Sequence, residues 1–194
     1  MIEEKIKKEI HQVAAGIFKQ FGYRKVNMAD FSDALRISRP SLYKHFQNKQ
    51  DILNLFILDE CDKILIASQN EINNTKSFYD NVVKFNQIKL GQIKAFTEEY
   101  HLVLNEMKEN YMFLYHLKDI LKQEEMEVYR KIILWSIQNS EIKPIEEERI
   151  TFLTDTIVST FRSMEISVLI NGKLDDNFFM KINWIAEVFQ KGLI

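Results

Sequence analysis

The clearest signal for the architecture of this chain is residues 37–46, which read ISRPSLYKHF. Ser38 is a favourable helix N-cap, and Pro40 is harmless in a first helical turn because the amides there have no intrahelical partners. Leu42 and Phe46 are four residues apart, so they share one face of the helix that follows, and the polar and basic residues point elsewhere. The stretch therefore predicts a short amphipathic helix over residues 39–46.

Helical spacing of apolar residues recurs on both sides of this stretch. Gly22 stands where a helix commonly ends, and Asn27 and Asn48 are N-caps with Asp30 and Asp51 three residues later. The pattern predicts helices over residues 3–21, 28–35, 39–46, 48–72, 78–96, 145–171 and 175–190. A further helix starts near 97–99, and residues 100–139 are helical with interruptions near 108–110 and 122–124.

Composition agrees with an all-α fold. The 194 residues include only 5 Gly and 2 Pro, which leaves few turn positions and favours long helices with short connections. The hydrophobic share of 46% is sufficient for a substantial core. We expect the chain to divide into two domains, residues 1–50 and residues 51–194.

Charge is distributed unevenly between these two segments. Residues 1–50 carry ten basic and five acidic side chains, net +5, whereas the remainder carries 16 and 23, net −7. A basic N-terminal segment before an acidic body makes a polyanion a plausible partner for the first segment.

The location of the protein follows from three absences in the sequence. A single cysteine, Cys61, cannot form an internal disulfide, and we find neither an apolar stretch of about 18 residues nor a cleavable leader. We expect a cytoplasmic protein with no membrane segment and no cofactor.

Two short helices joined by a tight turn and packed on a first helix form the tri-helical helix-turn-helix DNA-binding unit. Three stretches carry a more specific resemblance: AGIFKQFGY at 15–23, ISRPSLYKHF at 37–46, and Asn48-Lys49. They resemble the N-terminal domain of TetR-family transcriptional regulators. The resemblance covers the first 55 residues or so and implies an all-helical homodimeric repressor, released from operator DNA by a small effector. It implies a helix-turn-helix DNA-binding domain at residues 1–50 and a helical-bundle domain for effector binding and dimerisation at residues 51–194.

The resemblance also implies roles for individual residues. Arg39, Pro40 and Lys44 match base-reading positions, and a guanine edge and a thymine methyl suit Arg39 and Pro40. The phosphate-contacting positions are matched by Ser41, Tyr43, His45 and Lys49, and positions at the start of the second helix that touch DNA are matched by Asn27 and Met28.

Two positions depart from the family pattern. Arg36 stands where the turn between the second and third helices usually has glycine, so it must be left-handed or the turn must differ. Ala29 stands where the second helix often has a basic residue, which removes one candidate base contact.

Residues 51–194 contain no recognisable motif, so what we expect of this segment is less specific than what we expect of residues 1–50. Aromatic residues suggest a pocket for a greasy or flat aromatic effector, with a dense core lacking any pocket as the alternative; the candidate lining is Phe85, Phe96, Tyr100, Tyr111, Tyr115, His116, Trp135 and Phe161. The helices at 145–171 and 175–190 resemble the pair that forms the family's dimer interface, and their broad apolar faces suit an isologous contact.

Two other functions stay open at this level. One is a helical protein-interaction module whose basic segment binds an acidic partner. The other is a helical-bundle metal enzyme, for which a single Glu-x-x-His, Glu98 to His101, is the nearest motif; di-iron bundles need two. We therefore expect no enzymatic activity and no metal site.

Overall fold

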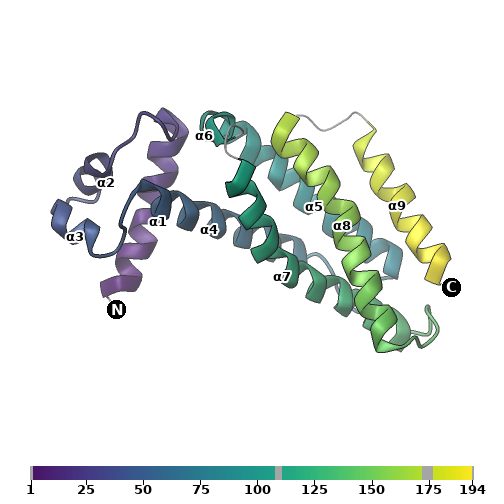
Figure 1. Cartoon of the computed structure of the whole chain (residues 1–194). Coiled ribbons are helices and arrows are strands. Elements are labelled where there is room, and N and C mark those ends of the chain that lie inside the picture. The colour runs from purple at the N-terminus through teal and green to yellow at the C-terminus, as the bar shows by residue number, and fades with distance from the viewer. Residues whose placement is uncertain (1, 108–110, 172–176, 194) are drawn as a thin grey trace. The chain divides into compact units, whose positions relative to one another are not determined.

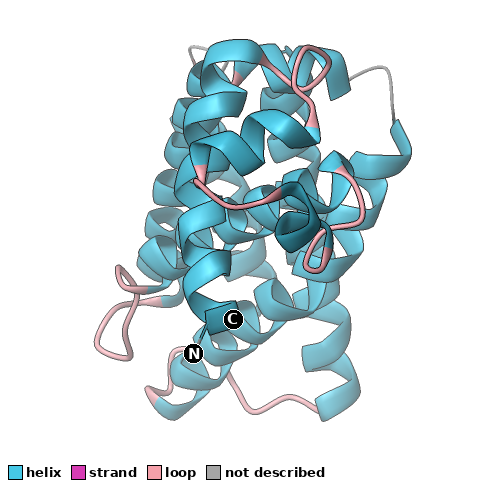
Figure 2. Ribbon diagram, turned by 90° about the vertical axis from the view of Figure 1, so that its left-hand side faces the viewer, coloured by secondary structure: helices cyan, strands magenta, loops and turns pink. Residues whose placement is uncertain are grey.

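The computed structural model describes residues 2–107, 111–171 and 177–193, with side chains for 9–107, 122–170 and 177–193. In these ranges every regular element is a helix (Figures 1 and 2). The helices are α1 (Ile2–Phe21), α2 (Met28–Ala34), α3 (Arg39–Tyr43), α4 (Lys49–Gln69), α5 (Phe78–Glu99), α6 (His101–Met107), α7 (Tyr111–Gln138), α8 (Glu147–Asn171) and α9 (Phe178–Leu193). The all-α prediction is confirmed.

The chain forms two compact units. Unit 1 comprises Met1–Lys63 and Glu98–Leu114, and unit 2 comprises Ile64–Thr97 and Tyr115–Ile194. Thus α6 belongs with the N-terminal helices, although it follows α5 in the chain. These units are defined by which residues pack together. The predicted boundary after residue 50 concerns which segments carry function, and it stays a prediction.

The predicted helix ends of unit 1 are set by the caps expected from sequence. Asn27 and Asp30 form a complete capping box at the start of α2. Ser38 accepts a hydrogen bond from the Ser41 amide at the start of α3, and Asn48 accepts from the Gln50 amide. The third helix is shorter than the predicted range 39–46: α3 ends at Tyr43.

The core of unit 1 is built around Phe18, which is fully buried. Its ring centroid lies 5.5 Å from that of Phe31 on α2 and 5.6 Å from that of Phe56 on α4. These offset aromatic contacts add to the area that each ring buries. Leu42 of α3 is fully buried and Phe46 nearly so, which confirms that they are core residues.

Unit 2 has a core formed by α5, α7, α8 and α9 together with Leu65 of α4. Tyr129 of α7 is buried among aromatic side chains, with its ring 5.4 Å from Phe85 and 6.3 Å from Phe161. The interruption predicted near 122–124 is wrong, since α7 continues through these residues. They are good helix formers, and packing of Val128, Ile132 and their neighbours continues the helix. The interruption predicted near 108–110 lies outside the described residues.

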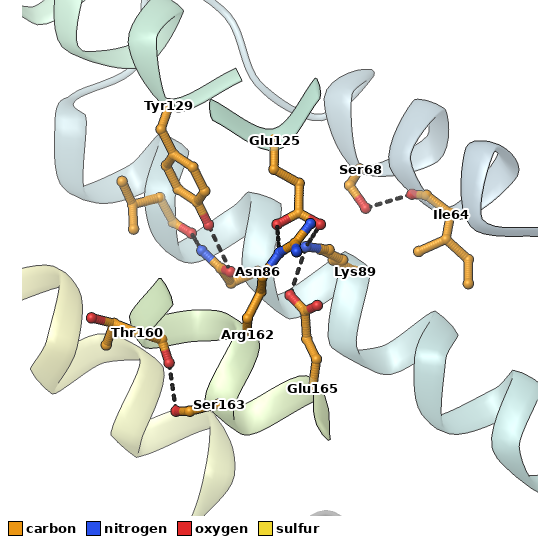
Figure 3. A network of polar contacts seen from close by, with 11 residues as sticks. Ile64, Ser68, Asn86, Lys89, Glu125, Tyr129, Thr160, Arg162, Ser163 and Glu165 are labelled. Carbon is orange, nitrogen blue, oxygen red and sulfur yellow. Dashed lines mark hydrogen bonds and ion pairs between the residues drawn. The ribbon is translucent and has the colours of Figure 1, made fainter. Parts of the chain in front are cut away.

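A network of charged side chains is buried within this second core (Figure 3). Lys89 Nζ of α5 lies 2.6 Å from carboxylate oxygens of both Glu125 and Glu165, and Arg162 Nε donates to Glu125 at 3.1 Å. Burial alone would lower the pKa of Lys89, but the two carboxylates outweigh it and the pKa is raised. Two cations thus balance two anions in a site with almost no access to water.

No helix within the described ranges is both long and apolar enough to cross a membrane.

The turn between α2 and α3 adopts the strained form that the sequence allowed. Arg36 has φ +56°, in the left-handed region where a Cβ is unfavourable. Its amide donates to Asp33 O at 3.1 Å, and the Ile37 amide donates to Ser32 O at 3.0 Å. The turn therefore keeps its hydrogen bonds with a residue other than glycine.

We expect Arg36→Gly to raise the free energy of unfolding by about 0.5–1 kcal/mol, because glycine adopts positive φ without a Cβ clash. Urea denaturation followed by circular dichroism measures this. Arg36→Ala is the matched control, since it removes the same side chain but retains the Cβ. Equal stability of the two variants would show that the backbone of Arg36 is not strained.

Candidate nucleic-acid interface

The candidate interface is α3 and its flanks in unit 1. Helix α2 contacts both α1 and α3, so the two short helices and the turn at Arg36 are packed on the first helix as in a helix-turn-helix unit. The burial of Leu42 and Phe46 fixes which face of this segment points inward.

The opposite face of α3 is exposed and basic. Arg39, Pro40 and Lys44 are all exposed, and Tyr43 retains 51% of its accessible surface despite being a large aromatic residue. The structure therefore brings these four predicted contact residues together on one surface. Guanidinium, ammonium and phenol groups suit base edges and phosphates.

Ser41 and His45 are partly buried beside this exposed face. Ser41 Oγ lies 2.9 Å from Ser38 Oγ, so its hydroxyl already has a partner within the helix start. Their phosphate contacts stay predictions.

Asn27 and Met28 lie at the start of α2 as predicted. The Asn27 side chain accepts from the Ala29 amide at 2.8 Å and is therefore engaged in capping, while Met28 is partly buried. Their DNA contacts also stay predictions.

Lys49 takes an internal position that sequence reasoning did not anticipate. Its Nζ donates to the carbonyl oxygens of Tyr23 at 2.8 Å, Val26 at 2.9 Å and Arg24 at 3.4 Å, and lies 4.3 Å from the Tyr23 ring centroid. The ammonium thus satisfies carbonyls of the loop between α1 and α2 and makes a cation–π contact. Its phosphate contact stays a prediction, and its positioning role is the new finding.

Glu106 of α6 holds the same loop from its amide side. Its Oε2 accepts from the Tyr23 amide at 2.6 Å and from the Arg24 amide at 2.8 Å. We call this pair of contacts, with those of Lys49, the loop clamp. A carboxylate binds the amides and an ammonium binds the carbonyls, so both charged groups make charge-assisted bonds. Nothing in the sequence spacing identified Glu106.

Gly22 is required next to the loop clamp for two reasons. Its φ is +75°, and a Cβ at this position would lie 3.0 Å from Glu106 Oε1. The predicted left-handed helix end is confirmed, and close approach of the Glu106 carboxylate adds a second constraint.

Tyr23 is held neutral beside the loop clamp. Its hydroxyl donates to Gln50 Oε1 at 2.9 Å, and burial together with the charge of Asp51 raises its pKa above the ordinary value.

Among the described side chains, the residues expected to line an effector pocket are divided between the two units. Phe85 and Phe161 are buried core residues around Tyr129, and Phe96 and Trp135 are partly buried. Tyr100 belongs to unit 1, where its ring packs 4.9 Å from that of Phe56. The side chains of Tyr111, Tyr115 and His116 lie outside the described part of the chain.

A surface hollow of about 640 Å³ lies in unit 2 between α7 and α8. None of the expected pocket residues whose side chains are described lines it. The lining is Lys122, Gln123, Met126, Glu148, Thr151, Phe152 and Asp155.

The histidine of the single Glu-x-x-His motif makes a local backbone contact. His101 Nδ1 lies 3.1 Å from the backbone oxygen of Glu98, which ties the histidine to the start of α6.

Comparison with known proteins agrees with this geometry. Residues 10–55 match the family described as "Bacterial regulatory proteins, tetR family". No curated protein matches the chain.

Solved structures share the fold over almost the whole chain. A transcriptional regulator from Cytophaga hutchinsonii is 16% identical, with 95% of this chain and 96% of that one covered and a TM-score of 0.70. A TetR-family regulator from Pectobacterium atrosepticum is 16% identical over 99% and 95%, with a TM-score of 0.70. A TetR regulator from Haloarcula marismortui is 9% identical over 98% of both chains, with a TM-score of 0.68.

We expect Glu106→Gln to lower the free energy of unfolding by about 1–2 kcal/mol, because an amide accepts more weakly from the two loop amides than a carboxylate does. Urea denaturation of the full chain measures it. Glu99→Gln is the matched control: its 2.9 Å ion pair with Lys19 is exposed, and breaking it should cost less than about 1 kcal/mol. An equal or smaller loss in Glu106→Gln would contradict the loop clamp.

Proposed function

We propose that this chain is a TetR-family regulator and acts as a homodimeric repressor. It binds a pseudo-palindromic operator and is released by a small-molecule effector. The observation that carries this proposal is the exposed, basic face of α3 opposite the buried Leu42 and Phe46. Regulators of this family are transcription factors and not enzymes.

In the proposed complex, α3 and the residues after it enter the major groove. Arg39 donates two hydrogen bonds to a guanine edge, Pro40 packs on a thymine methyl, and Lys44 reaches a neighbouring base. Phosphates are contacted by Ser41, Tyr43, His45 and Lys49 and by Asn27 and Met28 at the start of α2. A basic N-terminal segment, net +5, supports this arrangement.

Dimerisation through α8 and α9 is supported by apolar side chains left exposed in unit 2. Met180, Trp184 and Val188 of α9 recur every four residues and are 42%, 54% and 70% exposed. Phe152 and Ile166 of α8 are 67% and 41% exposed. Large exposed apolar side chains at helical spacing mark an interaction surface, and a two-fold axis pairs such a surface with itself.

Effector control requires two states that differ in affinity for the operator. We place effector binding in unit 2 and operator binding in unit 1. Helices α4, α5 and α7 each have residues in both units, so the chain offers three continuous helices through which binding in one unit biases the other. A repressor of this kind acts in the cytoplasm, where the chromosome is.

We expect Arg39→Ala to lower operator affinity by about 1–3 kcal/mol and to relax selection at one base position in each half-site. Fluorescence anisotropy measures both effects, with a duplex that the protein enriches from a random pool and with single-base variants of that duplex. Lys131→Ala, which removes one exposed charge from unit 2, should leave both unchanged. If Arg39→Ala discriminated between bases at every position as the unaltered protein does, the placement of α3 in the major groove would be contradicted.

We expect Trp184→Glu to convert the dimer into a monomer, because it places a charge in a desolvated apolar contact. Multi-angle light scattering should then give a mass near 23.1 kDa in place of twice that value. Ile66→Glu is the matched control, since Ile66 of α4 is also exposed, at 57%. A dimeric Trp184→Glu would exclude this face as the interface.

A further inference from the structure

A histidine and two carboxylates converge between α1 and α4 in unit 1, away from the proposed DNA contacts. His11 Nε2 of α1 lies 2.9 Å from Asp59 Oδ2 and 3.0 Å from Glu60 Oε1, both on α4. The three atoms all lie within 4.8 Å of one another. Only 13% of the His11 side chain is exposed, and its ring packs on Phe56 at 5.5 Å, so its orientation is held by packing.

A cation already stands where these atoms converge. Lys63 Nζ lies 2.8 Å from Glu60 Oε1 and 3.2 Å from both Asp59 Oδ2 and His11 Nε2. The Lys63 side chain is 54% exposed, so it can turn into solvent without opening the core. In the tautomer with its proton on Nδ1, His11 presents a lone pair to this cation, which is also the form that binds a metal.

We propose that His11, Asp59 and Glu60 bind a divalent transition-metal ion of the Zn²⁺ class in exchange for the Lys63 ammonium. One imidazole nitrogen and two carboxylate oxygens are ligands that Zn²⁺ accepts, and a water molecule completes a four-coordinate site. The exchange also improves the charge balance. The two carboxylates face a single positive charge when the Lys63 ammonium is present, and they face two positive charges when a divalent ion replaces it.

The ion would connect α1 to α4. Because both helices pack on Phe18 and Phe56 in unit 1, an ion held between them binds the folded state and not the unfolded chain. Binding therefore stabilises unit 1 by mass action.

The test uses the untagged full chain, treated with chelator and titrated with Co²⁺ as the probe. We expect a visible d–d absorption that saturates at one ion per chain and disappears when Zn²⁺ is added. His11→Ala should abolish it, and His101→Gln, which changes another histidine of unit 1, should retain it. If His11→Ala does not fold, Asp59→Asn and Glu60→Gln provide the same test.

Lys63→Ala distinguishes exchange from ordinary surface binding. Removal of the competing ammonium should make Co²⁺ binding several-fold tighter. Weaker or unchanged binding in this variant would overturn the proposal, as would the absence of a saturable spectrum or its persistence in His11→Ala. Loss of the spectrum in Cys61→Ser would assign the ion to the neighbouring thiol and also overturn it.

Discussion

The DNA-binding unit depends on the way two opposite charges hold the loop between α1 and α2. Glu106 binds the amides of Tyr23 and Arg24, and Lys49 binds carbonyls of the same loop. This loop carries no regular structure of its own, yet it leads directly into the capping box of α2. With both its donors and its acceptors satisfied by charged groups, the loop sets where α2 begins and, through the turn at Arg36, where α3 lies.

The loop clamp also explains why α6 belongs to unit 1. Glu106 stands 83 residues from Tyr23 in the chain, and the exposed pair of Glu99 with Lys19 is 80 residues apart. Helix α6 therefore provides part of the scaffold for the helix-turn-helix, while the helices before and after it continue into unit 2. The proposed regulation needs such a connection, because effector binding in one unit must bias operator binding in the other.

Features set by neighbouring residues were predictable from the sequence, whereas contacts between residues far apart in the chain were not. The caps at Asn27, Ser38 and Asn48, the inward face of Leu42 and Phe46, and the left-handed Gly22 follow from residue type and spacing within a few positions. Glu106 and the internal role of Lys49 do not, because each acts on a loop more than 20 residues away. The sequence likewise gave no sign that Lys89, Glu125, Arg162 and Glu165 are buried together, since charged residues ordinarily indicate an exposed face. Spacing alone does not distinguish an aromatic ring that packs a core, as Phe85 does, from one that lines a pocket.

The proposed function requires that two copies of α3 read a specific duplex. Sequencing of the DNA that the purified protein enriches from a random duplex pool, at near-physiological salt, examines this requirement. We expect an inverted repeat whose half-sites are centred about one helical turn, roughly 34 Å, or a multiple of it apart. Enrichment of no sequence, with binding that only weakens as salt rises, would contradict it and favour a basic surface that binds any polyanion.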